Sequence, residues 1–133
     1  MQDLWWSIKV PYTKADLNWM DKKSRSSIEM NDKSFRPEIE DSDANIKQYD
    51  TIFVGFPIWW YVAPTIINTF LESYDFSGKK IIIFATSGGS GFGNTLKELK
   101  VSVSETTEVI QGELMNGKQS FDKVNAWVKK LNL

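Results

Sequence analysis

Two short segments of this chain carry residue types suited to binding a flat ring. The first, Pro57-Ile58-Trp59-Trp60-Tyr61, follows an apolar run and sets three large aromatic side chains in succession. The second begins Thr86-Ser87-Gly88-Gly89-Ser90-Gly91 and has four glycines among the eight residues 86–93. Aromatic side chains offer stacking area at low entropic cost, and glycines let main-chain N–H and C=O groups approach a ligand closely. Together the two segments predict a planar slot for a heterocycle.

Each segment also has a simpler structural interpretation. The aromatic rings could cap the core or an interface, and the glycines could form a tight turn between a strand and a helix. The glycine spacing differs from that of the G-x-G-x-x-G dinucleotide fingerprint, and no glycine-rich loop with a lysine is present. The sequence therefore favours a ligand site formed by aromatic rings and main-chain groups, and not one formed by a recognised nucleotide-binding motif.

The elements around these segments predict a parallel sheet. Residues 51–56 and 80–85 are almost continuously apolar, as expected of parallel strands that helices cover on both faces. Each run leads into its loop and then into a helical pattern, which begins at Pro64 in one case and near Asn94 in the other. Open α/β folds bind ligands at the carboxyl edge of the sheet. We therefore expect both loops at that edge, side by side.

The N-terminal third has weaker patterns. Leu4 to Val10 alternates as an edge strand would, and Pro11 ends it. Residues 12–42 predict short helical turns, followed by a brief helix at 43–48. The apolar side chains expected to fix residues 12–42 to the core are Trp19, Ile28, Met30 and Phe35.

The C-terminal half predicts three further features. The helix after Pro64 should end at residues 75–78, and Thr95 with Glu98 predicts a capping box in the next helix. Residues 109–115 predict a strand interrupted near Gly112. Ser120 should cap a last helix. The apolar stripe of that helix comprises Phe121, Val124, Trp127, Val128 and Leu131.

Length and composition exclude several function classes. With 133 residues, the chain predicts one α/β domain over residues 1–133. Cysteine and histidine are absent, which removes disulfides, thiolate or imidazole metal ligands and the usual near-neutral base. A net charge of −1 and the lack of a basic stripe argue against a nucleic-acid partner. No apolar run is long enough for a membrane span and no secretion signal is apparent, so we expect a cytoplasmic protein.

Residues 49–79 and 84–91 resemble the bacterial flavodoxin family, in the branch of small FMN-binding flavodoxin-like proteins. Residues 11–19 and 34–37 also resemble that branch. The resemblance implies a five-stranded open parallel sheet with helices on both faces and FMN as the cofactor. It also implies that Pro57 to Tyr61 contact one face and edge of the isoalloxazine ring. Thr86 to Gly91 would then hydrogen-bond the pyrimidine edge of the ring.

The chain departs from this family in one respect. The family's first strand, its Ser/Thr/Gly phosphate loop and its first helix have no counterpart, so the expected fold is truncated at the N-terminus. The missing strand would lie beside residues 51–56. Three hypotheses fill the gap: Leu4 to Val10 pairs with 51–56, a second copy supplies a strand in a homodimer, or the natural protein carries the missing piece. Trp5 and Trp6 would suit the dimer interface.

The functional expectations follow from the resemblance. The leading hypothesis is electron transfer or flavin-mediated reduction, with a redox partner protein or a small acceptor, without a metal and without a catalytic side chain. One alternative is a truncated flavodoxin scaffold that binds no flavin tightly. Another is an NAD(P)H-dependent quinone or flavin reductase, although the sequence contains no recognisable nicotinamide motif.

Overall fold

The computed structural model describes residues 8–40 and 44–133. Its centre is a sheet of three parallel strands in the order β1-β2-β3, formed by Thr51–Pro57, Lys80–Thr86 and Glu108–Leu114. Thr51 pairs with Lys80, and Lys80 pairs with Glu108, so the three strands start level. The predicted open parallel sheet is therefore confirmed.

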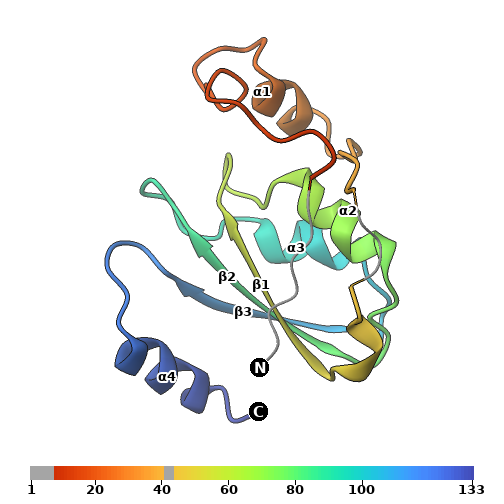
Figure 1. Cartoon of the computed structure of the whole chain (residues 1–133), viewed down its shortest axis with the longest axis vertical. Coiled ribbons are helices and arrows are strands. Elements are labelled where there is room, and N and C mark those ends of the chain that lie inside the picture. The colour runs from red at the N-terminus through yellow and green to blue at the C-terminus, as the bar shows by residue number, and fades with distance from the viewer. Residues whose placement is uncertain (1–7, 41–43) are drawn as a thin grey trace.

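Helices cover both faces of this sheet (Figure 1). Helices α2 (Thr65–Ser73) and α3 (Thr95–Lys100) lie on one face, and α4 (Phe121–Lys130) lies on the other. This confirms the predicted α/β architecture. A 3₁₀ turn, η1 (Ile46–Gln48), precedes β1 within the brief helix expected at 43–48, whose first residue lies outside the described residues. No helix in the described ranges combines the length and apolarity needed to cross a bilayer.

Burial explains the layers. The side chains of Ile81, Ile82 and Ile83 have 0% exposure, because β2 is the central strand and is covered on both faces. Side chains alternate between faces along a strand. On one face, Ile81 and Ile83 join the main apolar cluster. On the other, Phe53 and Phe84 pack edge-on against Trp127 of α4, with ring centroids 5.8 and 6.2 Å away.

Strand β3 contains the interruption predicted near Gly112, in the form of a register shift. Its pairing with β2 changes between Ile83 and Ala85. A Cβ atom at Gly112 would lie 2.5 Å from the Ile83 carbonyl oxygen and 2.7 Å from the Trp127 ring. Glycine is therefore required for strand and helix to approach this closely.

Of the two helix caps predicted from the sequence, one is confirmed and the other is wrong. The Ser120 hydroxyl accepts a hydrogen bond from the Lys123 amide at 3.2 Å, which confirms the predicted cap. The capping box predicted for Thr95 and Glu98 is wrong, because the N-cap residue of α3 makes no side-chain cap bond. The Glu98 carboxylate accepts instead from the Lys33 ammonium at 2.9 Å.

The apolar stripe predicted for α4 is wrong at its first residue. Trp127 is buried at 8% exposure, whereas Phe121 is 83% exposed. Phe121 opens the helix, while the aromatic contacts with the sheet are made at Trp127, more than one turn later.

Residues 10–36, here called the lobe, lie beyond the carboxyl ends of the strands at the top of Figure 1. They contain α1 (Arg25–Met30), so the predicted short helical structure is present. The predicted apolar anchors are wrong for Trp19, Ile28 and Phe35, which are 68%, 52% and 37% exposed. The residues of α1 that are buried are polar, namely Ser26, Ser27 and Glu29.

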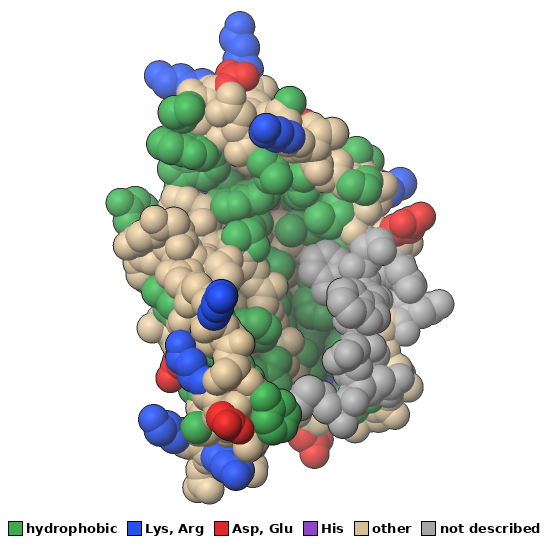
Figure 2. Space-filling view, turned by 60° about the vertical axis from the view of Figure 1, so that its left-hand side comes forward, with side chains coloured by type: hydrophobic (Ala, Val, Ile, Leu, Met, Phe, Trp, Pro, Cys, Tyr) green, Lys and Arg blue, Asp and Glu red, His purple; other side chains and the backbone are tan. Residues whose placement is uncertain are grey.

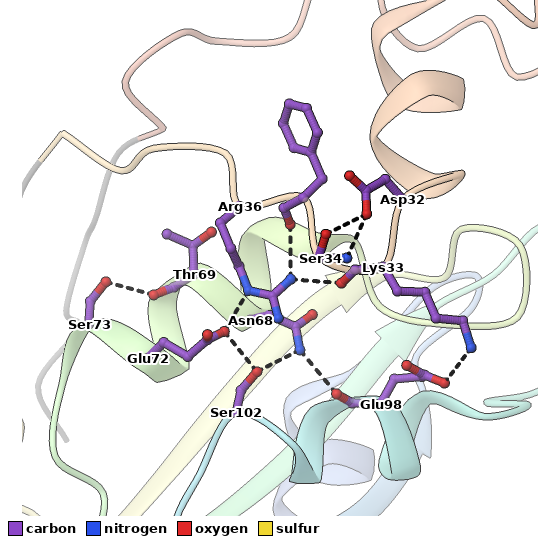
Figure 3. Close-up of polar contacts among 11 residues, drawn as sticks. Asp32, Lys33, Ser34, Arg36, Asn68, Thr69, Glu72, Ser73, Glu98 and Ser102 are labelled. Carbon is purple, nitrogen blue, oxygen red and sulfur yellow. Dashed lines mark hydrogen bonds and ion pairs between the residues drawn. The ribbon is translucent and has the colours of Figure 1, made fainter.

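Polar contacts explain why the lobe is oriented this way (Figure 3). The Arg36 Nε donates to Glu72 of α2 at 2.6 Å, and Lys33 pairs with Glu98 of α3. Behind these pairs, the Asn68 amide donates to the Ser102 hydroxyl at 2.8 Å and to the Glu98 carbonyl oxygen at 3.0 Å. Charged side chains thus attach the lobe to α2 and α3, while its Trp19, Ile28 and Phe35 side chains stay exposed.

The predicted strand Leu4 to Val10 falls mainly outside the described residues, as do Trp5 and Trp6. Its described end makes one isolated antiparallel bridge, between Ile8 and Ile39. Within the described residues, β1 pairs with β2 alone. Residue 8 therefore does not continue the sheet, and the way in which the edge of β1 is completed stays a prediction.

Candidate functional site

The two predicted loops lie side by side at the carboxyl edge of β1 and β2 (Figure 1). Where the loops begin, the Ile58 amide donates to the Thr86 carbonyl oxygen at 2.8 Å. Where they end, the Asn94 amide donates to the Tyr61 carbonyl oxygen at 3.0 Å. A Cβ atom at Gly93 would lie 2.5 Å from the same Tyr61 oxygen, so the contact requires glycine.

The aromatic turn, defined as residues 57–62, contains a tight hairpin. Trp59 and Val62 exchange two backbone hydrogen bonds of 2.9 and 3.1 Å. Between them, Trp60 and Tyr61 have φ angles of 47° and 66°. Hairpins with positive φ at both central residues favour Asn-Gly, and each L-residue in this region costs about 1–2 kcal/mol. Backbone strain of this kind gathers at functional sites.

This backbone presents aromatic rings at the surface. Trp60 and Tyr61 are 44% and 64% exposed, and they help line a cavity of about 410 Å³ whose other walls come mainly from the lobe, α2 and α3. Trp59 is half-buried, and its ring packs edge-on against Tyr12 of the lobe, with centroids 5.4 Å apart and planes at 89°. Figure 2 shows hydrophobic side chains gathered below the lobe around a hollow on this side of the molecule.

The glycine-rich loop, defined as residues 86–93, is shaped by hydroxyl and amide side chains. The Ser87 hydroxyl donates to the Ser90 carbonyl oxygen and accepts from the Gly89 amide at 3.0 Å. The Ser87 amide donates to Asn116 Oδ1 at 2.7 Å. Asn116 lies in the connection between β3 and α4, 29 residues later, so no local pattern in the sequence could find it.

Three glycines of this loop, Gly88, Gly89 and Gly91, face open space. A Cβ atom at Gly88, Gly89 or Gly91 would meet no atom within 4 Å. In the described part of the chain, the amides of Gly88, Ser90 and Gly91 donate to no acceptor. These main-chain donors are therefore available to a ligand that approaches closely.

A polar cluster lies behind the aromatic turn. The Tyr12 hydroxyl donates to the Glu29 carboxylate, which also accepts from the Arg25 Nε at 2.7 Å. Burial first, and then the neighbouring Glu29, raises the pKa of the Tyr12 phenol above its ordinary value of 10.0. The sequence offered no signal for Tyr12, because its partner Trp59 lies far along the chain.

The predicted site residues therefore form two groups. Pro57, Ile58, Trp59, Trp60 and Tyr61 belong to the aromatic turn. Thr86, Ser87, Gly88, Gly89, Ser90 and Gly91 belong to the glycine-rich loop. Backbone hydrogen bonds bring the two groups together, while Tyr12 and Asn116 support them from other elements.

Two solved structures resemble the chain over most of its length. A presumed flavoprotein from Bacteroides eggerthii has a TM-score of 0.86 and 43% identity, over 96% of this chain and 79% of that one. A presumed flavoprotein from Bacteroides uniformis has a TM-score of 0.85 and 48% identity, over 93% of this chain and 78% of that one.

Two further similarities are more distant. A flavoprotein from Lactobacillus acidophilus, solved in complex with FMN, has a TM-score of 0.57 and 23% identity, over 81% of this chain and 70% of that one. At this identity the likeness shows the fold alone. The uncharacterized NAD(P)H oxidoreductase YcaK of Escherichia coli is 32% identical over 41 residues, 31% of this chain. The match spans 21% of that relative, about a fifth of its length.

A family model described as flavodoxin matches residues 3–131, nearly the whole chain. This match agrees with the parallel sheet and with both Bacteroides structures. The chain therefore belongs to the flavodoxin family.

Proposed function

We propose that this chain binds FMN and serves in electron transfer or in flavin-mediated reduction of a small acceptor. The observation that carries the proposal is the placement of a strained aromatic turn beside an open glycine-rich loop. The left-handed Trp60 and Tyr61 hold their rings at the surface at a cost in stability. The flavodoxin family and the two Bacteroides relatives described as presumed flavoproteins support a flavin as the cofactor.

The two loops have different roles in this proposal. Trp59 or Trp60 stacks on a face of the isoalloxazine ring, and the other residues of 57–61 border its edge. The main-chain amides of Gly88, Ser90 and Gly91 donate to the pyrimidine edge, because they have no other acceptor among the described residues. FMN, when bound, supplies the redox chemistry. No side chain of the site then needs to act as an acid or a base.

The site segments themselves are uncharged. Residues 57–61 and 86–91 contain no Asp, Glu, Lys, Arg or His. They offer no cation to stabilise negative charge on a reduced ring, so we expect a reduction potential below that of free FMN. Spectroelectrochemical titration measures this potential, and a value above that of free FMN would contradict the assigned surroundings.

Titration with FMN tests binding directly. We expect quenching of both flavin and tryptophan fluorescence at micromolar protein. Replacing Trp59 and Trp60 together by alanine should abolish this quenching. Trp19→Ala is the matched control, because Trp19 is 68% exposed in the lobe and has no place in the proposed site. A wild-type protein that stays colourless after reconstitution would contradict the proposal and favour a scaffold without tight flavin binding.

A second candidate is an NAD(P)H-dependent quinone or flavin reductase. The observation that favours it is the 41-residue match to the oxidoreductase of Escherichia coli. Steady-state oxidation of NADH or NADPH, with FMN and a quinone added, separates the two functions. An electron carrier should show no turnover above that of free FMN, whereas a reductase should show saturable turnover.

A further inference from the structure

Tyr12 connects the lobe to the aromatic turn. Its ring meets the Trp59 ring edge to face, with centroids 5.4 Å apart and an interplanar angle of 89°. This geometry is among those that aromatic pairs prefer. It means that the orientation of the Trp59 indole depends on where Tyr12 is held.

Three contacts hold Tyr12 from the side of the lobe. Its hydroxyl donates to the Glu29 carboxylate. The Arg25 guanidinium carbon lies 3.9 Å from the centroid of the Tyr12 ring, in cation–π geometry. The same guanidinium donates to Glu29 at 2.7 Å and to the Val10 carbonyl oxygen at 2.6 Å. The position of the ring is thus fixed through its face and its hydroxyl.

Packing alone does not explain the cluster of Tyr12, Arg25 and Glu29. Glu29 is 2% exposed, while its neighbour Ile28 is 52% exposed on the same short helix. Burying a carboxylate is unfavourable unless it is paired and hydrogen-bonded. An apolar side chain at position 29 would fill the space without that penalty, but it would give Tyr12 no directional partner. The carboxylate therefore serves to orient the phenol.

We propose that Tyr12 is a positioning residue of the flavin site, which sets the plane of the Trp59 indole and is itself set by Glu29 and Arg25. The inference rests on the proposed FMN function and extends the site into the lobe. A correctly oriented indole lowers the cost of binding a ring, because the side chain need not be ordered on binding.

The test compares variants by FMN affinity and by flavin reduction potential. Tyr12→Ala should weaken FMN binding about three- to tenfold, the equivalent of one aromatic pair. It should also raise the reduction potential, since the stacked indole is displaced. Tyr12→Phe keeps the ring edge but loses the hydroxyl that Glu29 orients, so it should recover only part of the affinity. Glu29→Gln should give a smaller loss, because its amide oxygen can still accept from the Tyr12 hydroxyl but no longer carries a charge.

Tyr74→Phe serves as the control. It removes a hydroxyl that accepts from the Ala44 amide at 3.1 Å, a contact that involves neither loop, so affinity and potential should stay unchanged. If Tyr12→Ala does not fold, Tyr12→Leu fills the space without an aromatic edge and should show the same losses.

The outcomes separate this inference from the proposed function. If the wild-type protein binds FMN and the folded Tyr12→Ala or Tyr12→Leu variant matches it in affinity and potential, the positioning role is overturned and FMN binding stands. If the wild-type protein binds no FMN, both proposals fall. Weaker binding by Tyr12→Ala, with partial rescue by Tyr12→Phe, supports the positioning role.

Discussion

The aromatic turn and the glycine-rich loop leave neighbouring strands at the same edge, yet they reach left-handed backbone in opposite ways. In the turn, Trp60 and Tyr61 adopt positive φ although neither residue type favours it. In the loop, the residues with positive φ are Gly89 and Gly93, for which it carries little cost. The aromatic turn is thus strained and exposes aromatic rings, whereas the glycine-rich loop has few large side chains and exposes main-chain amides. A slot for a planar ligand needs both surfaces.

Gly93→Ala should have the largest effect on stability, because it breaks the junction of the two segments. Gly93 has φ of +51°, and a Cβ atom there would lie 2.5 Å from the Tyr61 carbonyl oxygen. We expect the free energy of unfolding to fall by roughly 3 kcal/mol from backbone strain and overpacking. Chemical denaturation measures this.

The matched control for that change is Gly91→Ala. A Cβ atom at Gly91 would meet nothing within 4 Å, so the free energy of unfolding should change by less than about 0.5 kcal/mol. Equal losses in the two variants would show that the close approach at Gly93 does not join the loops.

Replacing Trp60-Tyr61 by Asn-Gly should separate stability from binding. Asn-Gly is the favoured pair for this hairpin, so the free energy of unfolding should rise by about 1–2 kcal/mol. FMN affinity should fall, because two exposed rings are lost. Parallel denaturation and FMN titration measure the two effects, with Trp19→Asn in the lobe as the control. A loss of stability in the turn variant would mean that the rings serve packing.

Asn116→Ala tests the support of the glycine-rich loop. The Ser87 amide would lose its acceptor at 2.7 Å, a contribution of about 1 kcal/mol. If the loop must be ordered to bind, FMN affinity should fall about fivefold. Lys118→Ala changes an exposed side chain in the same connection and should leave the affinity unchanged. An unchanged affinity in Asn116→Ala would show that the loop orders itself without this bond.

The smallest expected effect is at alkaline pH and concerns Tyr12, the lobe residue that contacts the aromatic turn. Burial and Glu29 raise the pKa of Tyr12 above the ordinary value of 10.0, so the folded protein holds this proton more tightly than the unfolded chain. The resulting stabilisation is complete below pH 10.0 and is lost as pH rises towards the folded pKa. Denaturation from about pH 8 to about pH 11 should show a steeper decline in wild type than in Tyr12→Phe. Parallel curves would contradict this.

The sequence was sufficient for the three strands of the described sheet and for the place of the loops. The run Ile81 to Ile83 is a local signal for a strand buried on both faces, and the topology of such strands brings their loops to one edge. Tyr12 and Asn116 escaped detection because their partners are distant in sequence. The lobe was predicted incorrectly at Trp19, because ion pairs, and not the burial of that indole, connect the lobe to the helices.

The ionic attachment of the lobe makes the proposed site responsive to dissolved electrolyte. The Arg36–Glu72 and Lys33–Glu98 pairs are partly exposed, and screening at high ionic strength weakens such pairs, while the isoleucine-lined sheet is little affected. High salt should therefore weaken the attachment of the lobe to α2 and α3 more than it weakens the sheet. Since Tyr12 belongs to the lobe and contacts Trp59, ambient salt would act on the Trp59 indole from a distance.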